Sequence, residues 1–322
     1  MKISFIVPVF NEQDSLVELT ARIKSAVLAL PSPTEYEIVL VDDGSTDQSW
    51  SRINDLSQDP DNHIKALGLR RNFGKAAALS VGMNHVAGEL VFTLDADLQD
   101  DPKEIGKFLH KLDEGYDLVS GWKRKRNDPL AKTAPSKLFN WVTAKLTGLP
   151  LNDFNSGFKC YRREVIDKLH IYGELHRYIP VLAADLGYRV AEIEVEHHAR
   201  LYGSSKYGWE RYARGLLDLI TVLTITRWMQ KPGHLFGGVG ILLGIIGGTT
   251  LSYLFALWLL DMGPIGTRPL LLFGIMVSIF SLQMVSFGLI AEFIVRVRGP
   301  IDTQLLIKKS ISTSAEKLPE HP

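Results

Sequence analysis

Five carboxylates lie close together in the stretch TLDADLQDDPKE, residues 93–104, directly after a short apolar run. Asp95 and Asp97 are two residues apart, so both side chains point to the same side if the chain is extended there. Paired carboxylates favour a hard divalent cation, which prefers oxygen ligands. Mg²⁺ keeps few protein ligands and completes its shell with water and substrate phosphates. The pair therefore predicts a Mg²⁺ or Mn²⁺ site that receives a phosphate-bearing ligand.

A hydrated surface loop is the alternative for this stretch, because such a loop also tolerates like charges and D-x-D pairs occur by chance on surfaces. If a metal ion does bind, Gln99 would add a neutral ligand to it. Asp100 and Asp101 precede Pro102 and are interpreted as the start of the next helix, because acids favour the positive end of the helix dipole.

The elements that must position these residues alternate along the first 230 residues. The apolar runs KISFIVPVF, EIVLV, HIKALGL and ELVFT predict strands, and helical patterns separate them. This alternation predicts an α/β fold with a Rossmann-like, mostly parallel sheet. Ligands of such sheets bind beyond the carboxyl ends of the strands, where NE, DDGS, RNFGK and DADLQ all fall. We therefore expect a single active cleft.

Two long segments near the C-terminus are strongly apolar. Residues 235–260 and 270–291 contain no charged side chain, and each exceeds the roughly 20 residues that a helix needs to cross a membrane. They predict two membrane spans at about 235–260 and 270–294. Basic residues flank both, so the positive-inside rule places the flanks and the N-terminal domain in the cytoplasm. Two buried helices of a soluble protein are the alternative.

We expect four parts along the chain. Residues 1–206 form the cytoplasmic domain, and residues 207–232 form an amphipathic helix whose aromatic and basic side chains suit the membrane interface. A packing role for this helix is the alternative. Residues 233–296 hold the two spans, and the polar residues 297–322 form a cytoplasmic tail.

Composition excludes several classes of protein. Lysine plus arginine balances aspartate plus glutamate at 36 each, so no nucleic-acid partner is expected. The single cysteine, Cys160, rules out an intramolecular disulfide and suits a reducing compartment. Dinucleotide and Walker phosphate-binding motifs are absent. His197 and His198 are not spaced like a zinc site with nearby cysteines, and we interpret them as strand-end residues.

Seven motifs in order resemble those of family-2 glycosyltransferases with the GT-A fold: IVPVFNE, VDDGSTD, RNFGKAAAL, DADLQDDP, SGWK, DFNSGFKCYRR and ARLYGSSKY. Among these enzymes the chain is most similar to polyprenyl-phosphate glycosyltransferases such as dolichol-phosphate mannose synthase. The resemblance covers about residues 1–230. The apolar hairpin resembles the bacterial subgroup that glucosylates undecaprenyl phosphate for O-antigen or other envelope polymers.

The resemblance implies a role for residues in most of these motifs. The residues implied to bind the nucleotide-sugar donor are Pro8, Phe10, Asn11, Glu12, Asp42, Asn72, Lys75, Asp95, Ala96, Asp97, Arg200 and Lys206. Asp95, Asp97 and Gln99 are implied to hold the metal ion. Two of these residues have plainer alternatives, because Lys75 also suits a helix start and Arg200 a surface strand end.

The chain departs from the family at SGWKR, where mannose synthases carry GSR. The acceptor phosphate is therefore assigned to the cations that follow, Lys123, Arg124 and Arg126. The motif NSGFK has Lys159 where arginine is common. The catalytic residues expected from these motifs are Asp97, Lys123, Asp153 and Arg200.

The substrates implied by the resemblance dictate a mechanism. A lipid phosphate is already anionic near neutral pH and needs little help from a general base. We expect direct displacement with inversion, in which the metal and the cations stabilise the leaving diphosphate. Asp153 then orients the sugar or the acceptor, with a loop or helix-cap role as the alternative.

The expected reaction is the transfer of a hexose, glucose from UDP-glucose, to undecaprenyl phosphate at the bacterial inner membrane. The alternatives are another donor, namely GDP-mannose, a UDP-aminoarabinose derivative or UDP-GlcNAc, and a non-catalytic membrane scaffold. Processive polysaccharide synthesis is disfavoured because the chain lacks Q-x-x-R-W and further spans. The glycines of GGVGILLGIIGG permit close helix contact, and a homo-oligomer is expected.

Overall fold

The computed structural model describes residues 1–124, 130–169, 171–173, 175–198, 210–224, 226 and 232–297. These residues fall into two compact units. The first unit is Met1–Val222 and the second is Leu223–Pro322.

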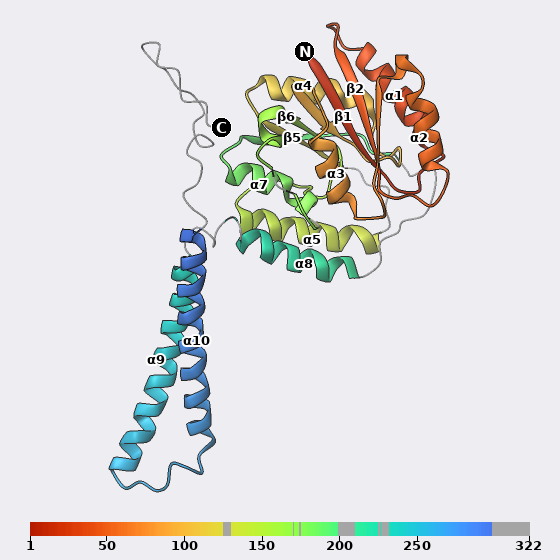
Figure 1. Cartoon of the computed structure of the whole chain (residues 1–322). Coiled ribbons are helices and arrows are strands. Elements are labelled where there is room, and N and C mark those ends of the chain that lie inside the picture. Colours follow the sequence, from red (N-terminus) through yellow and green to blue (C-terminus); the bar gives the residue numbers. More distant parts are fainter. Residues whose placement is uncertain are drawn as a thin grey trace. The chain divides into compact units, whose positions relative to one another are not determined.

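A seven-stranded sheet, counted over the described residues, forms the centre of the first unit (Figure 1). Its order is β3-β2-β1-β4-β6-β5-β7, where the strands are β1 (Lys2–Val9), β2 (Glu35–Asp42), β3 (Ile64–Gly68), β4 (Leu90–Thr93), β5 (Leu118–Trp122), β6 (Lys159–Arg162) and β7 (Val190–Glu194). Strands β3, β2, β1 and β4 are parallel to one another, as are β5 and β7. The predicted α/β fold with a mostly parallel sheet is confirmed.

Strand β6 is an element that the sequence analysis did not predict. It is antiparallel to both neighbours, and its first residue, Lys159, pairs with Thr93 of β4 and Ser120 of β5. Its four residues, KCYR, are too few to show a periodicity, and both ends are charged. The strand therefore forms because two existing strands hold it between them, which local sequence does not reveal.

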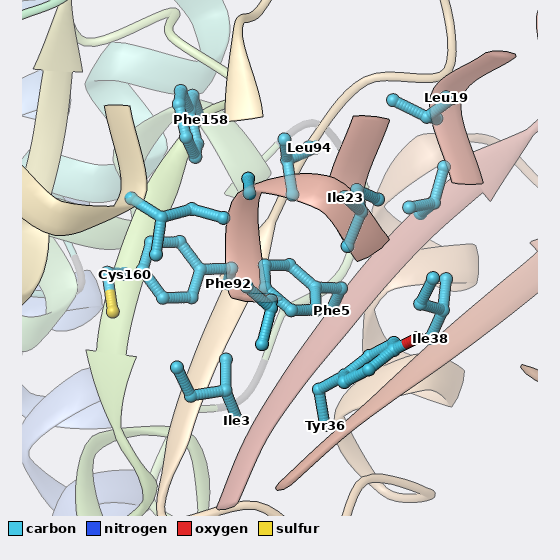
Figure 2. Packing of buried hydrophobic residues seen from close by; sticks show 14 of the residues in the cluster. Ile3, Phe5, Leu19, Ile23, Tyr36, Ile38, Phe92, Leu94, Phe158 and Cys160 are labelled. Atoms are coloured by element: carbon cyan, nitrogen blue, oxygen red, sulfur yellow. The ribbon is translucent and has the colours of Figure 1, made fainter. Parts of the chain in front are cut away.

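One face of the sheet carries the main hydrophobic core, shown in Figure 2. Helix α1 (Leu16–Leu28) and helix α4 (Ile105–Asp113) contribute apolar side chains to it. Phe92 of β4 stacks on Phe5 with ring centroids 5.3 Å apart and meets Phe108 of α4 edge-on at 5.6 Å. Such aromatic pairs add to the free energy gained by apolar burial. The core thus fixes β4 against β1, and with it the start of the DADLQ stretch.

Helix α3 (Lys75–Met83) packs on the opposite face of the sheet. A Cβ atom added to Gly82 would overlap the side chain of Ile6, so this glycine lets the helix approach β1 closely. The first residue of α3 is Lys75, and this packing brings its side chain to the carboxyl end of β4.

The remaining elements of the first unit are α2 (Ser49–Ser57), α5 (Leu130–Thr147), α6 (Arg163–Ile166), α7 (Ile179–Asp185) and α8 (Glu210–Leu223), with the short 3₁₀ turns η1 (Pro60–Asn62), η2 (Pro102–Glu104) and η3 (Leu175–Tyr178). Helix α8 lies within the segment predicted as an amphipathic helix. The hydroxyl of Tyr178 donates a hydrogen bond of 2.9 Å to the carbonyl of Gly215 in α8. Leu217 and Ile220 of the same helix are exposed apolar residues, so α8 packs on one side and presents apolar side chains on another.

The second unit contains two long helices, α9 (Pro232–Leu259) and α10 (Pro269–Val297). Within the described part of the chain, these two are long and apolar enough to cross a membrane. They pack closely along small residues: Ser281 Oγ donates a hydrogen bond of 2.7 Å to the carbonyl of Gly240, and a Cβ atom on Gly240 would lie 3.0 Å from the carbonyl oxygen of Ser281. The prediction of two helices at these positions is confirmed.

Candidate active site

The loops that follow β1 and β2 are joined by hydrogen bonds from the backbone. Asn11 has a positive φ of 55°, and its backbone N–H donates to Ser45 Oγ at 2.9 Å. The amide oxygen of Asn11 accepts from the N–H of Thr46 at 2.7 Å. The N–H of Glu12 donates to Ser49 Oγ at 2.9 Å. The two motifs predicted to bind the donor, NE and DDGS, therefore form one connected structure.

A buried carboxylate attaches a third motif to this structure. Asp43 accepts hydrogen bonds from the N–H groups of Phe73 and Gly74, at 2.7 and 2.9 Å. Burial raises the pKa of Asp43, although the two N–H donors act in the opposite direction. Gly44 has a φ of 69°, and a Cβ atom there would overlap the backbone of Arg71. Glycine at this position lets the RNFGK loop lie directly against the DDGS turn.

The other predicted donor residues of this region differ in exposure. Asp42 is buried and accepts from the N–H of Ser45 at 3.3 Å. Pro8 and Phe10 are partly buried at the end of β1, and Asn72 is exposed. The structure thus brings three of the predicted motifs to one edge of the sheet, where Asn72 is exposed to solvent.

The DADLQ stretch is a turn and not the end of a strand. Strand β4 ends at Thr93, before the first acid. Leu98 has a φ of 59°, and the N–H of Gln99 donates to Asp97 Oδ1 at 3.2 Å, which closes the turn. The extended geometry assumed for the acidic pair is therefore wrong. Ala96 and Asp97 are nonetheless buried, so the hydrated-loop explanation does not describe them.

Asp95 forms an ion pair with Lys75, the first residue of α3. Burial alone would raise the pKa of the Asp95 carboxyl, but the nearby ammonium groups of Lys75 and Lys123 outweigh it and hold the pKa well below its usual range. Asp95 is therefore ionised at neutral pH. Lys75 both begins a helix and reaches the acidic turn, so its two interpretations are compatible.

Lys123, predicted to bind the acceptor phosphate, is paired inside the protein. Its Nζ lies 2.7 Å from Asp100 Oδ1, and the two side chains are 10% and 1% exposed. Burial alone would lower the pKa of Lys123, but Asp100 and Asp95 together raise it. The interpretation of Asp100 as a helix start is wrong, because its carboxylate is buried against a lysine. Asp101 does take that role, since it accepts from the N–H of Lys103 at the start of η2.

The other predicted cations lie apart from this pair or outside the described residues. Arg124 is exposed and pairs with Glu194 at 3.2 Å. Arg126, Arg200 and Lys206 lie outside the residues that the structure describes.

Asp153, predicted to orient a substrate, is almost fully buried. Its backbone N–H donates to the carboxylate of Glu192 at 2.8 Å, and its own Oδ1 accepts from the N–H of Asn155 at 3.1 Å. Its charge acts on both Lys123 and Lys159. Asp153 therefore both stabilises a turn and contributes negative charge to the cluster around Lys123 and Lys159.

A small, partly open pocket lies beside this cluster. Its polar lining residues include Lys75, Thr93, Ser156, Lys159, His176 and Arg177. The sequence analysis named Lys75 among them but assigned no role to Lys159, His176 or Arg177. The one available signal was the lysine of NSGFK, which stands where arginine is common in the family that the sequence resembles.

Comparison with known proteins identifies the family. Residues 4–170 match the sequence profile of glycosyl transferase family 2. This chain belongs to glycosyltransferase family 2. It is 37% identical over 301 residues to a dodecaprenyl-phosphate galacturonate synthase from Rhizobium johnstonii, covering 92% of this chain and 88% of that protein. It is 36% identical over 324 residues to an undecaprenyl-phosphate 4-deoxy-4-formamido-L-arabinose transferase from Enterobacter sp., covering 98% and 97%.

A crystal structure confirms the fold expected of a family-2 glycosyltransferase. The glucosyl-3-phosphoglycerate synthase of Mycobacterium tuberculosis, in complex with Mn²⁺, uridine diphosphate and phosphoglyceric acid, superposes with a TM-score of 0.54. It is 19% identical and the match covers 70% of this chain and 78% of that one. The GT-A fold predicted from the sequence is thereby confirmed.

The placement of the metal ion on Asp95, Asp97 and Gln99 stays a prediction, and a second set among the described residues brings metal-ligating atoms close together. The predicted set offers oxygen atoms from Asp95, Asp97 and Gln99, and Asp95 is held ionised. This chemistry fits a hard divalent cation.

The second set, Asp101, Glu196 and His198, was not predicted. Its candidate ligand atoms all lie within 4.8 Å of one another, and His198 Nε2 lies 3.1 Å from Asp101 Oδ2. An isolated bridge between Asp100 and His197 brings these distant segments together, which explains why sequence spacing did not reveal the set.

Proposed function

We propose that this chain transfers a sugar from a nucleotide-sugar donor to the phosphate of a membrane polyprenyl lipid. The observation that carries the proposal is the cluster of two ion pairs at the edge of a family-2 domain: the partly exposed pair of Lys75 and Asp95 and the buried pair of Lys123 and Asp100. The same chain carries two helices apolar enough to cross a membrane. The names of two relatives that match nearly the whole chain support a polyprenyl-phosphate acceptor.

The reaction follows from the charges of the two substrates. A phosphate monoester has a second pKa near 6, so the acceptor oxygen is anionic and attacks the anomeric carbon without a general base. The new bond from carbon to phosphate oxygen forms as the bond from carbon to the donor diphosphate breaks, which inverts the anomeric centre. Asp95, Asp97 and Gln99 would hold a Mg²⁺ or Mn²⁺ ion, which would stabilise the charge of the leaving diphosphate.

The protein's own residues position the donor and balance the charge. Asp43 holds the RNFGK loop against the DDGS turn, which shapes the proposed nucleotide pocket. Lys75 holds Asp95 in place at the acidic turn. We assign Lys123 to balancing Asp100 and Asp95 inside the cluster, so the exposed Arg124 is the better candidate for direct contact with the acceptor phosphate.

The names of the relatives favour a different donor from the one first expected. They specify a formamido-arabinose and a galacturonate, and neither specifies glucose. We therefore propose a modified pentose or a uronate, the former being the aminoarabinose-type alternative of the sequence analysis. We also propose that α9 and α10 anchor the chain in the bacterial inner membrane, with the family-2 domain in the cytoplasm.

The decisive experiment combines the purified full chain in detergent with undecaprenyl phosphate and a panel of nucleotide sugars. UDP-linked formamido-arabinose, galacturonate, glucose and N-acetylglucosamine cover the named possibilities, together with GDP-mannose. We expect one lipid-linked sugar as product and its loss in EDTA, with recovery on addition of Mg²⁺ or Mn²⁺. Absence of lipid-linked product with every donor, from protein that remains folded, would contradict the proposal.

A further inference from the structure

The pocket beside the charged cluster is rich in basic groups. Lys75, Lys159 and Arg177 line it together with His176, and no carboxylate belongs to its described lining. It lies between the ends of β4 and β6, because Thr93 and Lys159 are paired residues of these two strands. The pairing of β6 with β4 therefore places the positive charge of Lys159 in this pocket.

Lys159 is the most deeply buried of these cations, with 3% of its surface exposed. Its Nζ donates a hydrogen bond to the carbonyl oxygen of Ser156. Within the part of the chain that the structure describes, no carboxylate oxygen lies within 4 Å of this ammonium. Burial and then repulsion by Lys75 lower the pKa of Lys159 to about 8, which leaves it charged at neutral pH. A buried charge of this kind is stabilised by an anion placed beside it.

His176 adds a second polar group to the same pocket. Its Nδ1 is shielded from solvent and has no hydrogen-bond partner among the described residues. Burial first, and then the positive charges of Lys75, Arg177 and Lys159, lower the pKa of His176. The ring is therefore neutral at pH 7, and a neutral imidazole with its proton on Nδ1 donates one hydrogen bond from that atom.

The pocket lies against the acidic turn of the proposed active site. Gly157 is part of its lining, and a Cβ atom there would overlap the carboxylate of Asp95. Thr93 Oγ1 donates to the carbonyl of Gly157 at 2.8 Å and fixes this backbone. A ligand group in the pocket is consequently a neighbour of the residues assigned to the donor diphosphate.

We propose that this pocket is an anion subsite in which Lys159 and His176 bind an oxygen of a substrate carboxylate or phosphate. The inference rests on the proposed function. Besides the donor diphosphate, which is assigned to the metal ion, the transfer brings two anions to this edge: a uronate carboxyl of the donor sugar and the phosphate of the lipid acceptor. Both present the same chemistry to an ammonium and an N–H group.

The first test measures anion binding without any transfer. The thermal midpoint of the full chain in detergent is followed as inorganic phosphate or free galacturonate is added at constant ionic strength. We expect at least one of these anions to raise the midpoint in the wild type and in Lys168→Met, whose lysine is exposed. The rise should be lost in Lys159→Met. An equal rise in Lys159→Met and wild type would overturn the proposal.

The second test distinguishes the two sources of the anion. UDP-galacturonate and UDP-galactose differ in the carboxylate, and each is assayed with undecaprenyl phosphate. If the donor carboxylate is bound, Lys159→Met lowers kcat/KM for the uronate by roughly 10- to 100-fold and leaves the galactose value nearly unchanged. If the acceptor phosphate is bound, KM for the lipid rises with either donor. Unchanged kinetic constants with both donors would refute the subsite.

A second variant covers the case in which Lys159→Met does not fold. His176→Asn removes the imidazole from a partly exposed side chain and should weaken the same anion effect. The two proposals also fail differently. Lack of transfer with every donor, combined with anion stabilisation that needs Lys159 or His176, would reject the transferase and keep the subsite. Normal transfer, together with anion binding that is unchanged in the Lys159 and His176 variants, would reject the subsite and keep the transferase.

Discussion

The loops after β1 and β2 and the cluster between β4 and β6 both belong to the proposed active site, yet they use carboxylates differently. In the first region Asp42 and Asp43 accept hydrogen bonds from backbone N–H groups. In the second, Asp95 and Asp100 pair with lysine side chains. Backbone partners fix the course of a loop, whereas lysine partners set a local charge. Substitutions in the first region should therefore mainly change loop conformation and stability, and substitutions in the second region should mainly change turnover.

The largest effect is expected from Asp97→Asn in the second region. This change keeps the side-chain oxygen that accepts from Gln99 but removes the negative charge proposed to hold the metal. Transfer should fall by about 1000-fold, in the range seen when one electrostatic contact to a transition state is lost. The rate is measured with saturating donor, and Asp113→Asn, an exposed acid at the end of α4, is the matched control. Normal turnover in Asp97→Asn would remove the metal assignment.

Lys123→Met should cause the largest loss of stability. It leaves Asp100 buried without its cation, which costs about 3 kcal/mol or more in free energy of unfolding. Urea unfolding in detergent measures it, and Lys103→Met on an exposed site should be nearly neutral. Adding Asp100→Asn to Lys123→Met should recover part of the loss. Independent, additive effects in this cycle would show that the two residues do not form a functional pair.

Asp43→Ala tests the first region. Two backbone N–H groups lose their acceptor, so the free energy of unfolding should fall by about 2 kcal/mol. The donor KM should rise because the RNFGK loop is released, while turnover at saturating donor stays close to that of the wild type. Asp55→Ala, exposed on α2, provides the comparison. If Asp43→Ala lowered turnover alone, Asp43 would act like the residues of the charged cluster, and the proposed difference between the two regions would be wrong.

The effect that is smallest near neutral pH is a pH dependence of stability at Lys159. Its pKa is about 8 in the folded chain and near 10.5 when unfolded, so between these values the unfolded state binds the additional proton. Wild-type stability should therefore increase relative to Lys159→Met as pH rises from 8 toward 10.5, by about 1 kcal/mol per unit. Below pH 8 the difference should be constant. A difference that is flat through pH 10 would mean that the lysine is not buried as described.

The sequence predicted the first region more completely than the second. Strands β1 to β4 were visible as apolar runs, and the polar motifs at their ends follow from the rule for parallel sheets. The two long apolar helices were equally clear from length and charge. These features are local, so a single segment carries its own signal.

The charged cluster depends on contacts between distant segments, and sequence patterns do not report these. Strand β6 was missed, and with it the burial of Lys159 beside Thr93. Asp100 is an exposed helix start by local rules, but Lys123 reaches it from the end of β5. His176 lies on a short 3₁₀ turn that has no periodic pattern at all.

The direction of β6 determines which of its residues lies at the edge formed by the carboxyl ends of the parallel strands. Parallel strands deliver their final residues there, but β6 runs the other way and delivers its first residue, Lys159. The position of that lysine is thus set by strand pairing, whatever the length of the chain between β5 and β6. A change of length within α5, away from Lys123, Asp153 and Gly157 of the same connection, should therefore leave Lys159 paired with Thr93 and Ser120.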